Sequence, residues 1–224
     1  KLLNYFYFNK KMFSTFILVN SFIKISSGLV FIPNMLTIDE QKKLGDIDSL
    51  ELIKDKKRIR MYDNIKKYPK VHNNVYKRYI DKALEIDKTL PRCIPTHCLT
   101  NFYKSSDGLL WHRDIYENDG DYDYTILNLS IGAPAIFGYE LKGKKKRIKL
   151  CSGDGILFGG KCRFLYHAIE YVFIDETPSW MKTPGRLSYT FRDSESMIGR
   201  EDEFKTFDVS GNDFKESQNR FKSL

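Results

Sequence analysis

The heptapeptide Arg186-Leu187-Ser188-Tyr189-Thr190-Phe191-Arg192 alternates strictly between polar and apolar side chains. Because successive side chains of a strand point to opposite faces, this period of two predicts a β-strand. Leu187, Tyr189 and Phe191 would then join a core. The polar face would point cations and hydroxyl groups into a cavity, where a guanidinium can bind a carboxylate through two hydrogen bonds.

Seven further short apolar runs precede this strand, and Gly, Asp, Asn or Lys turns separate them. They cover residues 99–103, 110–115, 125–131, 135–141, 146–150, 155–158 and 165–170. Short strands at this spacing are typical of a double-sheet jelly roll. Upstream, the patterns predict a short strand over 28–33 and helices over 37–44 and 75–88. We therefore expect an α+β, mainly β fold, in which a jelly-roll (double-stranded β-helix) core carries N-terminal flanking helices.

Four segments follow from these patterns. They are an N-terminal extension (1–27), N-terminal helices with a basic lid (28–97), the jelly-roll core (98–193) and a polar C-terminal tail (194–224). The first 38 residues contain no Asp or Glu, so an organellar presequence or an ordinary extension both fit them. The absence of Arg from this segment favours the ordinary extension.

Composition bounds the class of protein. With 224 residues, of which 42% are hydrophobic, the chain can bury a core and is not wholly disordered. The net charge of +8 suits a polyanionic partner, although it equally serves solubility. The four cysteines are scattered without CxxC spacing, which argues against a disulfide framework or a structural zinc site. We expect an intracellular monomer, in the nucleus, cytoplasm or mitochondrion, without a membrane span.

Three residues form a candidate metal site. His112 and Asp114 are two positions apart in a strand-like run, so their side chains would share one face. His167 lies in another strand-like run that could return a third ligand. Two histidines and one carboxylate form the facial triad of non-haem Fe(II) oxygenases, which leaves open metal positions for co-substrate and O₂. An isolated His-x-Asp pair is more often a hydrogen-bonded surface pair, and a single histidine is more often a packed core residue. The metal-site prediction therefore depends on the motifs that follow these residues.

The order of motifs resembles the AlkB family of nucleic-acid dealkylating dioxygenases. The resemblance covers about residues 99–193 and rests on Asn101-Phe102-Tyr103, His112-Arg113-Asp114, residues 133–137, Tyr166-His167 and the 186–192 heptapeptide. It implies an enzyme that uses Fe(II), 2-oxoglutarate and O₂ to oxidise N-alkyl groups on bases. The products would be formaldehyde, succinate and CO₂.

The resemblance also implies a role for each matching residue. His112, Asp114 and His167 would ligate iron and form the catalytic centre. Arg186 would bind the distal carboxylate of 2-oxoglutarate, with help from Tyr103 and Ser188. Asn101 and Arg192 would support the end of the co-substrate nearest the metal. Arg186 and Arg192 lie six residues apart, roughly 20 Å along an extended strand, so both arginines clamp one small acid only if their long side chains converge.

A nucleic-acid substrate would be single-stranded or flipped out, because a stacked base hides its alkyl group. Residues 54–78 hold ten Lys or Arg and two Asp, and Tyr62 or Tyr68 there could stack on a base. A solvated basic face with buried tyrosines is the alternative. Lys142 begins a basic run at an expected hairpin tip, where it would bind phosphate or protect a sheet edge.

One departure concerns the base. Members of the family often carry an acidic residue two positions after the metal-binding aspartate, where this chain has Tyr116. Tyr116 would then contact the substrate, and the preferred base stays open, as does the choice between DNA and RNA.

A protein side chain as substrate, on the same iron chemistry, is the alternative function. A non-catalytic binding module is disfavoured because all three candidate ligands and both arginines are present.

Overall fold

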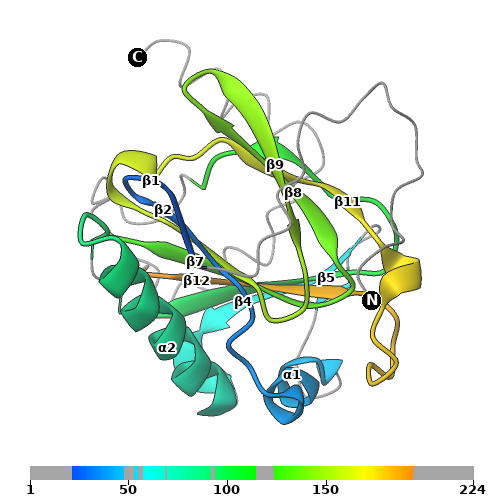
Figure 1. Cartoon of the computed structure of the whole chain (residues 1–224). Coiled ribbons are helices and arrows are strands. Elements are labelled where there is room, and N and C mark those ends of the chain that lie inside the picture. Colours follow the sequence, from blue (N-terminus) through cyan, green and yellow to red (C-terminus); the bar gives the residue numbers. More distant parts are fainter. Residues whose placement is uncertain are drawn as a thin grey trace, which may run out of the picture.

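The computed structural model describes residues 22–47, 53–54, 58–68, 70–91, 94–114 and 124–193, and for residues 53–54, 58–63 and Asn73 it describes only the backbone. Two antiparallel sheets face each other in this part of the chain (Figure 1). The larger sheet has eight strands in the order β1-β2-β10-β7-β12-β5-β4-β3, and the smaller has the order β6-β11-β8-β9. Two sheets of this kind confirm the expected jelly-roll core.

The strands of the large sheet come from the whole length of the described chain. Their bounds are β1 Ile23–Ser26, β2 Leu29–Ile32, β3 Ile53–Lys54, β4 Arg58–Asn64, β5 His97–Tyr103, β7 Ile126–Gly132, β10 Gly155–Phe158 and β12 Arg186–Arg192. The small sheet is built from β6 Leu109–His112, β8 Ala135–Leu141, β9 Lys144–Leu150 and β11 His167–Val172. The helices are α1 Ile38–Leu44 and α2 Lys70–Ile86, and short 3-10 turns cover Ile65–Lys67, Gly160–Cys162 and Ile174–Glu176.

The large sheet is buried on both faces, which creates two cores. Between the sheets, Ile126 and Phe158 of the large sheet pack with Phe137 and Ile148 of the small one. On the other face, α1 and α2 cover the large sheet (Figure 1). Every residue of β12 is buried, as a strand between two cores requires.

The side-chain alternation of β12 is as the sequence predicts. Leu187, Tyr189 and Phe191 belong to the core under the helices. The polar residues between them, Arg186, Ser188, Thr190 and Arg192, therefore point between the two sheets. A single strand thus supplies apolar anchors to one core and charged groups to the other, which is where the candidate site forms.

The predicted helix start at Thr37 is confirmed. Its hydroxyl accepts a hydrogen bond from the backbone N–H of Glu40 at 3.2 Å, and the Glu40 carboxylate accepts one from the Thr37 N–H at 2.9 Å. This capping box satisfies two N–H groups that a helix start leaves unpaired. Glu40 also forms an ion pair with Arg78 at 2.8 Å, which joins α1 to α2.

Residues 54–78 contain a strand that the sequence did not predict, and their role as a substrate lid stays a prediction. Residues 58–64 form β4, which pairs with the whole length of β5 at the edge region of the large sheet, and α2 begins at Lys70. Cations are common on such outer strands because they discourage pairing with other chains, and here they concealed a strand. Residues 22–27, assigned above to an extension, contribute β1 to the same sheet. Residues 1–21 and 194–224 lie outside the described residues, so the predictions for them stay predictions.

Candidate active site

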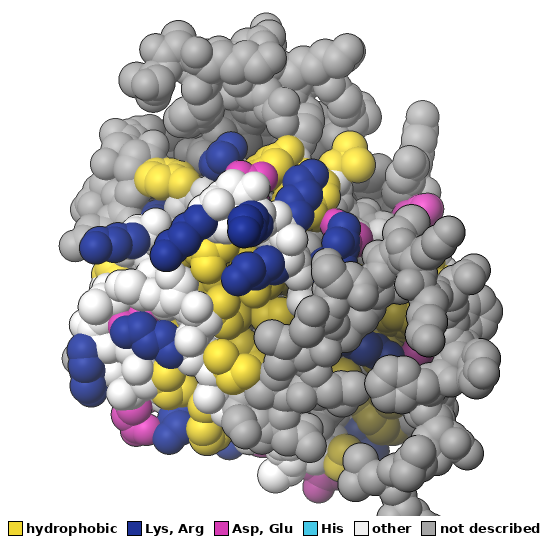
Figure 2. Space-filling view, turned by 45° about the horizontal axis from the view of Figure 1, so that its top comes forward, with side chains coloured by type: hydrophobic (Ala, Val, Ile, Leu, Met, Phe, Trp, Pro, Cys, Tyr) yellow, Lys and Arg dark blue, Asp and Glu magenta, His cyan; other side chains and the backbone are white. Residues whose placement is uncertain are grey.

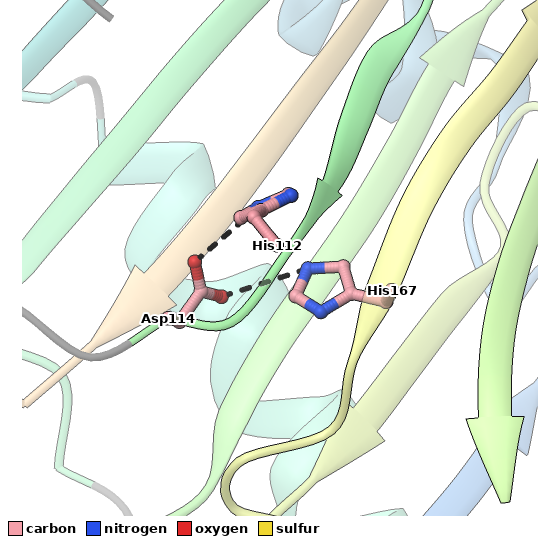
Figure 3. A group of neighbouring side chains, drawn as sticks. All are labelled: His112, Asp114 and His167. Atoms are coloured by element: carbon pink, nitrogen blue, oxygen red, sulfur yellow. Dashed lines mark ion pairs between the residues drawn. The ribbon is translucent and has the colours of Figure 1, made fainter. Parts of the chain in front are cut away.

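The three candidate ligands converge at the ends of two neighbouring strands. β6 ends at His112, β11 begins at His167, and the two histidines are direct partners in the antiparallel register. Asp114 follows two residues after His112, and its carboxylate faces both imidazole rings from one side (Figure 3). Its carboxylate oxygens are 3.7 Å from His112 Nε2 and 3.8 Å from His167 Nε2. The ligand atoms of all three residues lie within 4.8 Å of one another, a spacing that one metal ion can bridge.

Backbone carbonyls fix the tautomer of both histidines. His112 Nδ1 lies 2.8 Å from the Leu110 carbonyl oxygen, and His167 Nδ1 lies 2.8 Å from that of Leu165. A carbonyl oxygen only accepts, so each Nδ1 carries the proton and donates. Each Nε2 therefore presents its lone pair toward Asp114, as a metal ligand must.

The charge states of His112 and Asp114 also suit a divalent cation. Burial, with the nearby His167, lowers the pKa of His112 to about 4, against the opposing effect of Asp114. Burial alone would raise the pKa of Asp114, but Arg192 and the two histidines together hold it below its ordinary value. Neutral imidazole and ionised carboxylate are the forms that bind metal, so the site needs little proton release to do so.

The two arginines of β12 have different partners. Arg192 donates from Nη2 to Asp114 Oδ1 at 2.9 Å, so it orients the carboxylate of the triad. Arg186 lies at the other end of the strand, where Nε donates to Ser130 Oγ at 2.9 Å. Arg192 therefore lies at the metal end of the site. Arg186, six residues away, is placed to bind a group that lies farther from the metal.

Arg186 has the features of an anion-binding residue. It is fully buried, and Nη1 and Nη2 have no hydrogen-bond partner among the described residues. Burial lowers the pKa of its guanidinium, and the adjacent Tyr103, whose ring centroid is 5.3 Å away, opposes that shift. A buried cation without a counter-charge is costly. Two unpaired nitrogens of one fork fit the distal carboxylate of a dicarboxylate, which would supply both hydrogen bonds.

Strand register brings the other predicted co-substrate residues beside Arg186. On β5, Tyr103 is the register partner of Arg186, and Asn101 is the partner of Ser188. The Ser188 hydroxyl donates to Asn128 Oδ1 at 3.1 Å, and Asn128 Nδ2 in turn donates to Thr190 Oγ1 at 3.1 Å. Sequence reasoning missed Ser130 and Asn128, because their role follows from the pairing of β7 with β12 and no local motif marks it.

Arg163 was also missed, and it contacts the metal-binding segment directly. This arginine is 1% exposed, and Nη1 donates to the backbone carbonyl of Asp114 at 2.7 Å. Its Nη2 donates to the Tyr124 hydroxyl. Arg163 therefore holds the residues at both ends of segment 115–123, including the backbone of a candidate ligand. No sequence pattern distinguishes a buried arginine in the turn after β10 from an exposed one.

We predict that Arg163→Met weakens metal binding by about 10- to 100-fold, the usual effect of losing a group that orients a ligand. The measurement is calorimetric titration with Mn(II), a redox-stable substitute for Fe(II) that needs no turnover. Arg113→Met is the matched control, because Arg113 also neighbours Asp114 but is exposed and donates to the Phe164 carbonyl. Equal Mn(II) affinity in both variants would contradict the role of Arg163.

The four predicted substrate-contacting residues have different outcomes. Tyr68 does not fit that role, because it is 4% exposed, lies in the core under α2 and donates its hydroxyl to the Cys98 carbonyl at 2.8 Å. Lys142 is exposed and has a positive φ of 53° in the turn between β8 and β9, so the predicted hairpin tip is confirmed. Tyr62 belongs to β4 but its side chain is not described, and Tyr116 lies outside the described residues.

Comparison with known proteins agrees with this geometry. The family model of the 2OG-Fe(II) oxygenase superfamily matches residues 40–192. The Arabidopsis thaliana DNA N(6)-methyladenine demethylase ALKBH1C is 33% identical over 113 residues, which cover 46% of this chain and 25% of that protein. Escherichia coli AlkB, an alpha-ketoglutarate-dependent dioxygenase, is 35% identical over 34% of this chain and 36% of its own length. The Schizosaccharomyces pombe tRNA demethylase abh1 is 31% identical, over 38% of this chain and 28% of its own.

Solved structures show the same fold. OsALKBH1 superposes with a TM-score of 0.69 at 22% identity, covering 77% of this chain and all of that one. This chain spans only about a quarter to a third of the length of the curated relatives named above. The family match and the triad together assign Fe(II), 2-oxoglutarate and O₂ as the cofactor and co-substrates. The chain therefore belongs to the 2OG-Fe(II) oxygenase superfamily and, within it, to the AlkB family.

Proposed function

We propose that this chain removes alkyl groups from N-alkylated bases of DNA or RNA by oxidation, with release of formaldehyde, succinate and CO₂. The observation that carries the proposal is its similarity to proteins from a plant, a bacterium and a yeast, two of which are named as DNA or tRNA demethylases. The triad would bind the metal and the Arg186 fork would bind 2-oxoglutarate, the two binding sites that the reaction needs.

The residues of this chain divide the work of binding and orientation. His112, Asp114 and His167 would hold Fe(II), which supplies the oxidation of the alkyl carbon with O₂ and 2-oxoglutarate. Arg186 would bind the distal carboxylate of 2-oxoglutarate through Nη1 and Nη2, with Tyr103 and Ser188 beside it. Asn101 would contact the co-substrate nearer the metal, and Arg192 keeps Asp114 oriented.

Charge supports a polyanionic substrate. The net charge is +8, and Lys142, Lys144, Lys145 and Lys146 are exposed on and beside the β8–β9 hairpin. None of these four lysines forms an ion pair with a carboxylate in the described part of the chain. Free cations of this kind release counterions when they bind phosphates. Lys142, Tyr62 and Tyr116 are proposed to contact the nucleic acid. No helix in the described ranges is long and apolar enough to span a membrane.

The test is formaldehyde release in the presence of Fe(II), 2-oxoglutarate and O₂. Oligonucleotides that carry N1-methyladenine are supplied as DNA, as messenger-like RNA and as transfer RNA, with a methylated peptide in parallel. We expect turnover on at least one nucleic acid and none on the peptide. Turnover on the peptide alone would replace the proposed substrate class with protein. The ratio of kcat/KM values among the three nucleic acids then identifies the preferred one.

A further inference from the structure

The outer face of the small sheet carries aromatic rings that contact cations. Trp111 precedes His112 on β6, so its side chain points away from the metal site. It packs over Gly138 of β8, where a Cβ would lie 2.8 Å from Trp111 Cζ2. Tyr166, directly before His167, lies beside it, with the two ring centroids 5.3 Å apart. The two rings are therefore on the reverse side of the strand ends that hold the metal ligands.

One cation lies over each of these two rings. Lys145 Nζ is 4.3 Å from the Trp111 ring centroid, and Arg113 Cζ is 4.8 Å from that of Tyr166. We call these four residues the cation–aromatic cluster. Helices α1 and α2 pack against the large sheet, on the opposite side of the molecule from this face (Figure 1).

The balance of charge singles out this end of the sheet. Lys145, Arg147 and Lys149 alternate along β9 and so share its outer face. Arg147 pairs with Glu170 at 2.5 Å, and Lys149 pairs with Glu176 at 2.7 Å. Lys145 has no carboxylate partner among the described residues. The outer face thus has paired charges at the far end, whereas beside the metal ligands Lys145 lies opposite Glu140 of β8 in the register without an ion pair between them.

Two exposed apolar residues lie close to the cluster in the sequence. Leu110, directly before Trp111, is 74% exposed, and Phe164, two residues before Tyr166, is 40% exposed. The β8–β9 hairpin lies at the top of Figure 1 and comes forward in Figure 2, where Lys and Arg side chains gather with hydrophobic side chains between them. Exposed cations and exposed apolar surface occur together here, which suits a ligand that carries both anionic groups and flat apolar faces.

We propose that the cation–aromatic cluster binds the single-stranded flank of the nucleic-acid substrate, beside the nucleotide whose base enters the metal site. A single strand offers phosphates to Lys145 and Arg113, and its bases can take the place of these two cations over Trp111 and Tyr166 when the cations turn to the phosphates, whereas a duplex hides its base faces. The strand reaches the cluster by passing around the end of β6, because Trp111 and Arg113 flank the ligand His112. This inference rests on the proposed function and adds the place where the flanking nucleotides bind.

Intrinsic fluorescence tests the cluster without turnover. The chain has two tryptophans, Trp111 and Trp180, and Trp180 lies against Gly45 beside α1. In a Trp180→Phe background, an unmodified single-stranded oligonucleotide of about twelve nucleotides should quench Trp111 emission to saturation, because a base stacks on the ring. Polyphosphate of equal charge, which has no bases, should not quench it. Absence of quenching by the oligonucleotide, or equal quenching by polyphosphate, would overturn the proposal.

Two lysines on the same face of β9 provide a matched pair of variants. Lys145→Gln removes an unpaired charge and should reduce the salt dependence of oligonucleotide binding by about one phosphate contact. Lys149→Gln removes a charge that Glu176 already neutralises, so the salt dependence should stay close to that of the parent protein. Trp111→Leu should weaken binding by about tenfold through lost stacking. Equal salt dependence in the two lysine variants would count against the cluster.

Substrate length separates this inference from the proposed function. For a methylated oligonucleotide of about twelve nucleotides, which reaches the flank site, Lys145→Gln should lower kcat/KM. For a methylated mononucleotide, which has no flanking nucleotide and fills only the metal site, kcat/KM should stay unchanged. Quenching of Trp111 without turnover on either length would refute the proposed function and leave the flank site standing. Turnover on both lengths with no effect of Lys145→Gln would support the proposed function and refute the flank site.

Discussion

Replacing Asp114 with alanine is expected to abolish Fe(II) binding and all turnover of 2-oxoglutarate. Asp114 is the one carboxylate of the described triad, and its oxygens lie 3.7 and 3.8 Å from the two ligand nitrogens. Loss of a ligand should exceed the roughly 10- to 100-fold effect of losing an outer group. Fe(II) binding is measured by anaerobic titration and turnover by succinate release.

The same substitution should lower the stability of the metal-free protein. It removes the carboxylate that Arg192 binds at 2.9 Å in a buried setting, which costs about 3–5 kcal/mol when one partner of such a pair is deleted. Asp107→Ala is the control, because Asp107 is an exposed carboxylate just before β6. Fe(II) affinity that survives Asp114→Ala would remove the triad from the mechanism.

The second large effect is expected at Arg186. Arg186→Met should raise the KM for 2-oxoglutarate by at least about 30-fold, since truncating one partner of a buried charge pair costs about 2–5 kcal/mol. Arg186→Lys keeps the charge but not the two-nitrogen fork, so its KM should fall between the two. KM is measured from initial rates of succinate formation at saturating substrate.

Stability without 2-oxoglutarate distinguishes binding from a structural role. Arg186 Nη1 and Nη2 have no partner in the described part of the chain, so the metal-free and ligand-free Arg186→Met variant should be at least as stable as the parent. Added 2-oxoglutarate should raise the Tm of the parent protein but not that of the variant. A variant that is destabilised without ligand, yet keeps the parent KM, would show that Arg186 serves the core alone.

Local patterns predicted the strands that alternate or carry clear turns. The bounds of 135–141, 155–158 and 186–192 match β8, β10 and β12, because each run is short, apolar on at least one face and closed by a turn. The triad was also predictable in part. Two ligands lie two residues apart on one strand end, and the order of motifs supplied the third, although only the register of β6 with β11 brings it opposite.

The remaining features depend on contacts between distant segments. β4 was concealed by its cations, Arg58 and Arg60, which an outer strand tolerates but a strand pattern penalises. Arg163 acts through the carbonyl of Asp114, 49 residues away, so no local spacing marks it. Tyr68 was instead assigned a role that it does not have. Its position among lysines suggested a contact with a base, but it is a core residue whose hydroxyl donates to the Cys98 carbonyl.

The most direct test of the central claim is simultaneous measurement of succinate and formaldehyde from one N1-methyladenine oligonucleotide. With Fe(II), 2-oxoglutarate and O₂, the account predicts equal amounts of both products. Both should be absent with Asp114→Ala, and formaldehyde should be absent with the unmethylated oligonucleotide. Succinate without formaldehyde on every nucleic acid supplied, or formaldehyde formed without 2-oxoglutarate, would contradict the assignment of this chain as a nucleic-acid dealkylating oxygenase.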